Sequence, residues 1–339
     1  MADKATIAIG VVGCGAVAQV AHLPALASIE GADVCAVCDE DAGRAATVAG
    51  RFGVPTSYAS LDELLGHDGL QAVIVCTPNY LHADNSESAL RAGLHVLCER
   101  PLGINAEQTE RLLATAKETD RHLMVAHNHR YRPDAWALRQ AIERGELGEI
   151  FHVHASWQRR RTRRPRRRDW RRNMERAGGG VLMDLGVTNL DLGLWLLSYP
   201  VPERVTAHVV DRDGDGLEDT AVVALRLEGE STLGVDVSWD LIAHQDRHTV
   251  FALGANGSGS LSPFVISKEE EEGVVVEVTP RLAQGTENVY TASYRRELQH
   301  FLAVVRGNSQ PRLPEEQATL MRVVDASYRS AEEGREVVL

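Results

Sequence analysis

The chain has 339 residues, with 36 Lys and Arg against 48 Asp and Glu, which gives a net charge of −12. This length suffices for two domains with a core in each, and the 44% of hydrophobic residues excludes disorder of the whole chain. Because no apolar run reaches 18 residues and the chain enters a strand-like pattern directly, we expect a cytoplasmic protein with no membrane span or cleaved leader.

The first part of the chain alternates short apolar runs with amphipathic stretches. The spacing predicts strands at 6–12, 33–38, 71–76, 94–98 and 122–126. Between them it predicts helices at 17–29, 41–51, 80–92 and 105–119. Alternation of this kind is typical of a parallel sheet wound on both faces, so we predict a dinucleotide-binding Rossmann domain over residues 1–126.

A glycine motif lies at the first predicted strand-to-helix turn. Gly13, Gly15 and Ala18 form G-x-G-x-x-A, in which the first glycine permits the turn and the second lets the backbone approach a pyrophosphate. Asp39 ends the next predicted strand, 24 residues after Gly15. A carboxylate there accepts hydrogen bonds from the ribose hydroxyls and repels a 2′-phosphate, so the sequence favours NAD over NADP.

After residue 148 the period changes to strand alternation. A helix at 133–144 precedes strands predicted at 150–158, 203–211, 219–228, 232–240 and 247–253, and further helices are expected at 180–198, 290–306 and 315–333. Strands that follow one another without helices indicate an open, mainly antiparallel sheet. We therefore predict an α/β protein with a second domain over residues 127–339, for substrate and oligomerisation, whose last helix and tail could pack back on the first domain.

The basic residues are unevenly distributed. Only Lys4, Lys117 and Lys268 are lysines, and ten of the 33 arginines lie in the arginine strip, Arg159–Arg172. Ten arginines and one acid give this strip +9, so −12 − 9 leaves −21 on the remainder. Three explanations stay open: contact with a small anionic substrate, ion pairs with a neighbouring subunit, and nucleic acid binding. The acidic remainder and the scarcity of aromatic residues in the strip weigh against nucleic acid.

Several motifs together resemble the glucose–fructose oxidoreductase / inositol dehydrogenase / MocA family. Besides the glycine motif, they are TPN-x-x-H (77–82), ERP (99–101), NHRYRP (128–133), GGGVLMDLG (178–186) and the C-terminal tail. The resemblance runs nearly end to end. It implies a Rossmann domain followed by an α/β domain with an open sheet, NAD(P)-dependent chemistry on sugars and polyols, and a homodimer or homotetramer formed through that sheet.

The resemblance also assigns candidate site residues. Those that would contact the cofactor are Gly13, Gly15, Ala16, Val17, Ala18, Asp39, Thr77, Pro78, Asn79, His82, Glu99, Arg100 and Asn128. Those that would contact substrate are Arg130, Trp157, Trp170 and Arg171. The candidate catalytic residues are Arg100, Asp184 and Thr188.

This chain departs from the family pattern where proton transfer is expected. Arg100 stands where typical members have a lysine, and Thr188 stands where they have a histidine four residues after the motif aspartate, Asp184. Arginine stays protonated at neutral pH, and threonine has no useful pKa. Asp184, with a pKa raised by desolvation, is then a candidate base. His127 or His129 could substitute, although ordinary hydrogen-bonded strand histidines are the favoured interpretation of that pair and of His152 with His154.

Metal and disulfide chemistry are not expected. Five cysteines (14, 35, 38, 76 and 98) lie in apolar runs, which is typical of buried, reduced thiols, and the Cys35–Cys38 CxxC has no partner pair. The sequence DRDGDGLED at 211–219 opens like a calcium loop, but Val222 occupies the position that requires glutamate, so we predict a polar hairpin turn.

The sequence therefore predicts an NAD(H)-dependent oxidoreductase that transfers hydride to or from a sugar, polyol or sugar-acid derivative. Two alternatives stay open: a dinucleotide-binding regulatory or scaffold protein without turnover, and an enzyme that recycles bound NAD during epimerisation or glycoside cleavage. Missing proton-transfer groups favour the former, whereas Asp184 and the glycine motif count against it.

Overall fold

The computed structural model describes residues 6–161, 170–214, 216–270, 273–282 and 287–339. Its internal contacts divide the chain into two compact units, which are Met1–Tyr131 with Tyr290–Gln317, and Arg132–Val289 with Ala318–Leu339. The sequence placed one boundary after residue 126, whereas by contacts the first unit also takes in residues 290–317.

A six-stranded parallel sheet forms the centre of the first unit, in the order β3-β2-β1-β4-β5-β6. Its strands are β1 (Ile7–Val12), β2 (Ala32–Cys38), β3 (Thr56–Tyr58), β4 (Ala72–Val75), β5 (His95–Glu99) and β6 (Leu123–Ala126). The chain reverses its winding between β1 and β4, and ligands of such sheets bind outside the carboxyl ends of the strands at that point. The predicted parallel sheet is confirmed, with the short β3 added.

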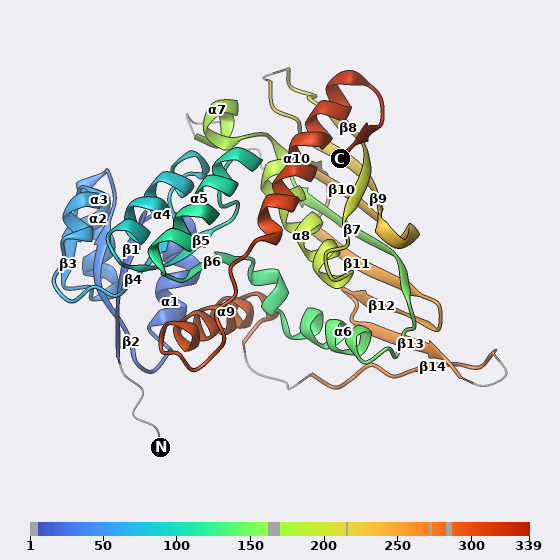
Figure 1. Ribbon diagram of the computed structural model, residues 1–339, viewed down its shortest axis with the longest axis horizontal. Coiled ribbons are helices and arrows are strands. Elements are labelled where there is room, and N and C mark those ends of the chain that lie inside the picture. Colours follow the sequence, from blue (N-terminus) through green and yellow to red (C-terminus); the bar gives the residue numbers. More distant parts are fainter. Residues whose placement is uncertain (1–5, 162–169, 215, 271–272, 283–286) are drawn as a thin grey trace. The chain divides into compact units, whose positions relative to one another are not determined.

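Helices cover both faces of this sheet (Figure 1). They are α1 (Leu23–Leu26), α2 (Ala42–Phe52), α3 (Leu61–Leu65), α4 (His82–Arg91), α5 (Ala106–Thr119) and α9 (Val289–Val305), and a π-helical turn, Ala18–His22, precedes α1. Side-chain caps begin α2, α3 and α5, as where the Asp41 carboxylate accepts a hydrogen bond from the Arg44 amide at α2. Phe301 and Leu302 of α9 are fully buried in the same core cluster as Ile9 of β1, which explains why α9 belongs to this unit.

The second unit contains a nine-stranded sheet in the order β14-β13-β12-β11-β7-β10-β9-β8-β15. Its strands are β7 (Ile150–Arg160), β8 (Pro202–Val210), β9 (Thr220–Leu227), β10 (Thr232–Leu241), β11 (Arg247–Gly254), β12 (Gly257–Leu261), β13 (Val265–Glu269), β14 (Val275–Glu277) and β15 (Val337–Val338). All pairings are antiparallel except β7 with β10, so the predicted mainly antiparallel sheet is confirmed. The strands from β12 to β15 were not predicted, because GSGSL and the short edge segments lack apolar alternation.

The helices of this unit are α6 (Pro133–Glu143), α7 (Met174–Ala177), α8 (Val187–Leu196) and α10 (Glu316–Glu333), with a π-helical turn, Leu182–Gly186, leading into α8. Along β9, inward residues such as Val223 and Leu225 are buried, while Val222 and Arg226 are exposed. The sheet therefore has one covered face and one open face.

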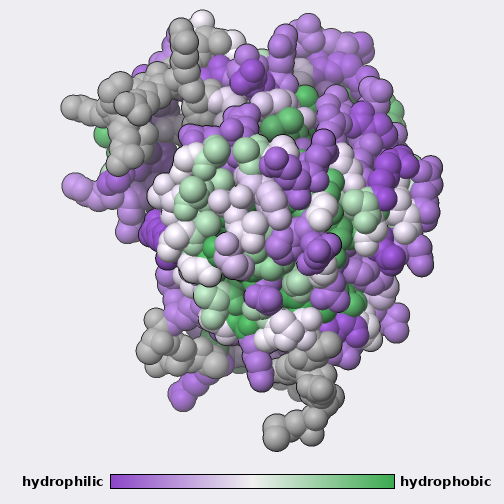
Figure 2. All heavy atoms as spheres, turned by 90° about the vertical axis from the view of Figure 1, so that its left-hand side faces the viewer, coloured by the Kyte–Doolittle hydropathy of each residue, from purple (hydrophilic) through white to green (hydrophobic). Residues whose placement is uncertain are grey.

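On the face of the protein drawn in Figure 2, hydrophilic residues surround a central area in which apolar and hydrophilic residues are mixed. Among the described residues, no helix is long and apolar enough to cross a membrane. All five cysteines are buried and unpaired, as expected for reduced thiols.

Candidate active site

The glycine motif forms a cradle at the carboxyl end of β1. Gly13 has φ +95°, and a Cβ there would lie 2.7 Å from the Cys76 carbonyl carbon, so only glycine fits. A Cβ on Gly15, in contrast, would meet no atom within 4 Å. The fold itself therefore does not require a glycine at position 15. The open space beside its backbone fits a ligand that approaches the backbone closely, as a dinucleotide pyrophosphate does.

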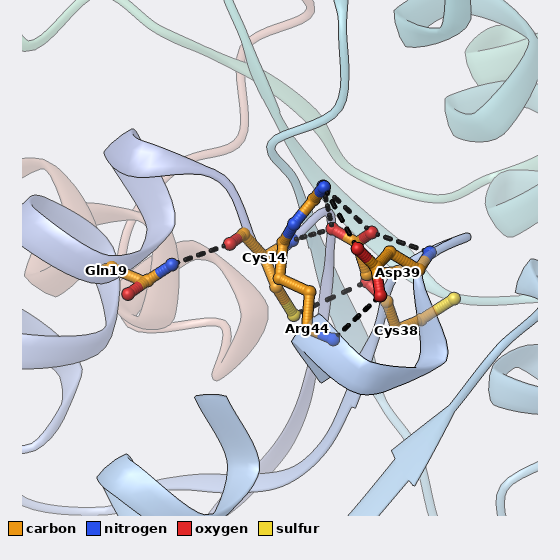
Figure 3. Close-up of polar contacts among 6 residues, drawn as sticks. Cys14, Gln19, Cys38, Asp39 and Arg44 are labelled. Carbon is orange, nitrogen blue, oxygen red and sulfur yellow. Dashed lines mark hydrogen bonds and ion pairs between the residues drawn. The ribbon is translucent and has the colours of Figure 1, made fainter. Parts of the chain in front are cut away.

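Asp39 lies beside this cradle at the end of β2. Its side chain is buried and accepts hydrogen bonds from the amide of Cys14 (2.9 Å) and the amide of Asp41 (3.0 Å). Arg44 contacts both carboxylate oxygens, at 3.1 and 3.3 Å (Figure 3). The structure thus places the Asp39 carboxylate next to the glycine motif, in contact with the amide of Cys14.

Arg44 is a residue that sequence reasoning missed. Its guanidinium is about half exposed, with 48% of the side chain accessible. The sequence feature that could have identified Arg44 as a site residue is its position five residues after Asp39, in the first turn of the following helix. An arginine at this place is a donor that can accommodate a 2′-phosphate, so it opposes the discrimination expected from Asp39.

The Thr77 turn and the Pro101 loop follow two neighbouring strands, β4 and β5. His82 connects them, since its Nδ1 lies 2.7 Å from the Pro101 carbonyl oxygen and its Nε2 lies 2.8 Å from the Thr77 carbonyl oxygen. The ring is 1% exposed, and burial lowers its pKa. His82 thus fixes the two loops, while the half-buried Thr77 and the largely buried Asn79 lie in the turn that it holds.

Glu99 ends β5 and is held by a buried histidine. The Nε2 of His22 donates to Glu99 Oε1 at 2.8 Å, and the Arg100 amide donates to Glu99 Oε2 at 3.3 Å. Burial raises the pKa of Glu99, but the His22 hydrogen bond and nearby charges, including Arg100, outweigh it, so the pKa lies below its ordinary value. His22 was not predicted as a site residue; it links the helix that follows the glycine motif to the ERP loop.

A second carboxyl group lies near Glu99. Glu297 of α9 is fully buried, and neither of its carboxyl oxygens has a hydrogen-bond partner among the described residues. Burial, together with the charge of Glu99, raises the pKa of Glu297 well above its ordinary value, while Arg130 acts against this. Burial at this place therefore favours the protonated, neutral form of the Glu297 carboxyl group.

Replacing Glu297 by glutamine is expected to stabilise the protein at alkaline pH. Because the pKa is raised on folding, the contribution of this group is fully present below its unfolded value of about 4.5 and is lost as pH rises through the folded pKa. Urea unfolding at about pH 5 and about pH 9 measures the effect, with the exposed Glu107→Gln as control. A difference between E297Q and wild type that is the same at both pH values would contradict a neutral buried Glu297.

Residues 127–130, which include the start of the NHRYRP segment, make contacts within the first unit. Asn128 Nδ2 donates to Ser293 Oγ at 2.9 Å, and Arg130 forms an ion pair with Glu316 at 3.0 Å. His127 and His129 are 2% and 6% exposed, and His127 Nε2 lies 2.8 Å from Gln317 Oε1. Both histidines are thus buried, but the expected strand placement is wrong, because β6 ends at Ala126 and His129 lies in a 3-10 helical turn, Asn128–Tyr131.

Asp184 lies in the π-helical turn of the second unit. Its Oδ2 accepts hydrogen bonds from Arg159 Nη2 of β7 at 2.9 Å and from Trp239 Nε1 of β10 at 3.1 Å. The Asp184 side chain is 22% exposed, so it is accessible. Thr188 follows four residues later and is 3% exposed, with no described partner for its hydroxyl.

A buried carboxylate, Glu218, holds the start of the helical run that carries Asp184. It accepts hydrogen bonds from the amides of Gly180 and Leu182 and from the hydroxyl of Tyr328, each at 2.9 Å. An anion at a helix N-terminus satisfies amides that have no partner inside the helix. Sequence reasoning did not find Glu218, because its partners are 36 to 110 residues away.

The remaining aromatic candidates also lie in the second unit. The Trp157 ring contacts that of His248 at 4.8 Å, and His248 Nε2 lies 3.0 Å from Asn189 Oδ1. Burial, together with the charge of Arg132, lowers the pKa of His248 to about 3, so this imidazole is neutral. His154 and His152 lie on the same strand as Trp157, and His154 pairs with Asp236 at 3.1 Å.

Only the ends of the arginine strip can be placed, because residues 162–169 lie outside the described part. Arg159 pairs with Asp184, and Arg161 pairs with Asp240 at 2.8 Å. The Arg171 guanidinium lies 4.4 Å from the Trp170 ring centre. Arg159 and Arg161 thus form ion pairs within their own unit.

Metal ligation has no support in the described residues, since no group of three or more His, Cys, Asp or Glu side chains is arranged to hold an ion. In the loop at 211–219 the Asp211 carboxylate accepts hydrogen bonds from the amides of Gly214 and Gly216, at 2.7 and 2.8 Å. These bonds are those of a polar turn; Asp215 lies outside the described residues.

A Rossmann sheet with an open glycine turn and an adjacent acid, followed by an open-sheet α/β unit, is typical of a dinucleotide-binding oxidoreductase. The chain belongs to the GFO_IDH_MocA family, because residues 7–127 match the NAD-binding Rossmann fold model of the oxidoreductase family and residues 139–339 match its C-terminal alpha/beta domain. The resemblance inferred from the motifs is thereby confirmed.

The chain is similar to known dehydrogenases along nearly its whole length. D-xylose 1-dehydrogenase (NADP(+)) 2 of Haloferax volcanii is 30% identical over 97% of this chain and 99% of that protein. Inositol 2-dehydrogenase of Rhizobium meliloti is 26% identical over 98% of this chain and 99% of that protein. Among solved structures, GenD2 from gentamicin A biosynthesis in complex with NAD is 27% identical, with a TM-score of 0.84 over 99% of this chain and 97% of that chain.

Proposed function

We propose that this protein is an NAD(H)-dependent dehydrogenase that oxidises or reduces a CH–OH group of a sugar, polyol or sugar-acid derivative. The observation that carries the proposal is the free space at Gly15, where a Cβ would meet no protein atom, whereas a Cβ on the nearby Gly13 would clash with the backbone of Cys76. The named activities of the relatives, on xylose and inositol, support the substrate class.

The residues present fit a nicotinamide dinucleotide. The loop from Gly13 to Ala18 would hold the pyrophosphate, Asp39 the adenosine ribose, and Glu99 with Arg100 the nicotinamide side. Further contacts to the cofactor would come from Thr77, Pro78, Asn79 and Asn128. When bound, such a cofactor accepts or donates a hydride at its nicotinamide ring.

The protein's own groups would handle the proton and the substrate oxygen. Arg100 donates to the reacting oxygen and stays charged. Asp184, which is accessible, takes the hydroxyl proton during oxidation and returns it during reduction. Thr188, one helical turn after Asp184, would orient the substrate through a hydrogen bond. Trp157, Trp170, Arg171 and Arg130 are proposed substrate contacts, with Arg130 already paired to Glu316.

A second candidate function is dinucleotide-dependent ligand binding without turnover. The observation that favours it is Thr188, a buried hydroxyl that cannot titrate at the position where the family has a histidine. An assay with NAD⁺ and a panel of sugars, polyols and uronates, followed at 340 nm, separates the two functions. Measured NAD binding without turnover of any compound would favour the binding protein.

We further propose that the protein prefers NAD to NADP, and that replacing Asp39 by serine reverses this preference. Loss of the charge-assisted bonds to ribose is expected to weaken NAD binding about 10- to 100-fold, while the released Arg44 strengthens NADP binding. Fluorescence titration with both dinucleotides measures the effect. Asp33→Asn, an exposed change at the other end of β2, serves as control. Tighter NADP binding by the wild type would refute the role of Asp39.

A further inference from the structure

Asp184 is held by a specific pair of side chains from two neighbouring strands. Arg159 of β7 and Trp239 of β10 both donate to the same carboxylate oxygen, at 2.9 and 3.1 Å. β7 and β10 pair in register as far as Gln158 opposite Ser238, and the register then shifts before Arg160 opposite Leu241, so Arg159 and Trp239 both lie at this irregularity of the pairing. A side chain with two such donors has a fixed orientation.

The charge of Arg159 is directed at Asp184 alone among the described residues. Its neighbours in sequence are engaged elsewhere, since Arg160 donates to the His244 carbonyl oxygen and Arg161 to Asp240. Arg159 is 42% exposed and Asp184 22% exposed, so water screens this ion pair only in part. An adjacent cation favours the charged form of a carboxylate.

Two other carboxylates, Asp240 and Glu218, have partners of their own. Asp240, next to Trp239 on β10, is shared by Arg161 and Arg212, and Glu218 is bound to the amides of Gly180 and Leu182. Thr188 carries no charge. Arg159 is a cation that lies directly on the Asp184 carboxylate.

We propose that Arg159 is a positioning residue that, together with Trp239, orients Asp184 and keeps it an ionised proton acceptor into the acidic range. Under this proposal the ion pair acts on the pKa of Asp184 in the direction opposite to the desolvation expected from the sequence. The inference rests on the proposed function for its consequence in turnover, but the ion pair itself can be tested without turnover.

The kinetic test compares pH profiles of Arg159→Gln and wild type. We expect the acid limb of kcat/KM to move to higher pH by about one unit and kcat to fall about tenfold. Arg159→Lys, which keeps the charge, is expected to retain the wild-type limb, and Arg160→Gln, which changes an arginine outside the pair, is expected to match wild type. An R159Q profile superimposable on wild type, or an R159K limb that moves as far as that of R159Q, would overturn the proposal.

The test without turnover uses Trp239 as a reporter. The protein has five tryptophans, so the difference in fluorescence between wild type and Trp239→Phe, each titrated with acid, isolates the indole that donates to Asp184. The midpoint of this difference is expected to rise by about one pH unit in an R159Q background. An unchanged midpoint overturns the inference. Failure of the wild type to oxidise any substrate, with the midpoint shifted, would instead count against the proposed function and leave the ion pair standing.

Discussion

Replacing Glu218 by alanine is expected to lower the free energy of unfolding by about 3–4 kcal/mol, the largest stability effect that we predict for a single side chain. The change removes a buried acceptor from the amides of Gly180 and Leu182 and from the hydroxyl of Tyr328. Each donor left without a partner in a buried place costs about 1–3 kcal/mol, and water that enters the new space recovers part of this. Urea unfolding followed by circular dichroism measures the loss.

Two further variants show whether the hydrogen bonds cause the effect. Glu218→Gln keeps one carbonyl acceptor and is expected to lose less than alanine, and Tyr328→Phe removes one donor and is expected to lose about 1 kcal/mol. Glu332→Ala, an exposed change on the same helix as Tyr328, should stay within about 0.5 kcal/mol of wild type. An E218A variant as stable as E332A would show that Glu218 does not hold the helix start.

Alanine at Gly15 is expected to abolish measurable cofactor binding while leaving the fold intact. Its Cβ meets no protein atom within 4 Å, so the unfolding free energy should change by about 0.5 kcal/mol or less. The same methyl group occupies the space that a pyrophosphate needs, and we expect a loss in NAD affinity of about 100-fold or more, or about 3 kcal/mol. Isothermal titration calorimetry with NAD⁺ measures this.

Alanine at Gly13 is the matched comparison. Here φ is +95° and the Cβ would lie 2.7 Å from the backbone of Cys76, so the expected result is a loss of about 2–4 kcal/mol in stability together with weakened binding. The pair separates the glycine that the fold requires from the glycine that the ligand requires. Normal NAD affinity in G15A would refute the cradle, and with it the observation that carries the proposed function.

Much of the fold could be predicted because it depends on local patterns. Runs such as IAIGVV at β1 are continuous in apolar residues, as strands covered on both faces must be, and they alternate with helices that begin at capping residues such as Asp41. The later strands alternate in polarity, which identifies a sheet with one open face. The segments that lack such a pattern, from β12 to β15, could not be predicted, since their pairing depends on neighbours already in place.

The candidate site likewise has features that the sequence predicts and features that depend on the tertiary structure. By itself, the sequence determined the glycine motif, Asp39 and the departures at Arg100 and Thr188, because each depends on residue type at a fixed spacing along the chain. Only the tertiary structure decided which side chains meet. It brings together side chains of separate elements: Arg44 contacts Asp39, His22 contacts Glu99, and Arg159 and Trp239 both contact Asp184. It also places the charge of Glu99 close enough to Glu297 to act on the pKa of Glu297. Ionisation follows burial and neighbouring charge, and neither can be known until distant segments have packed together.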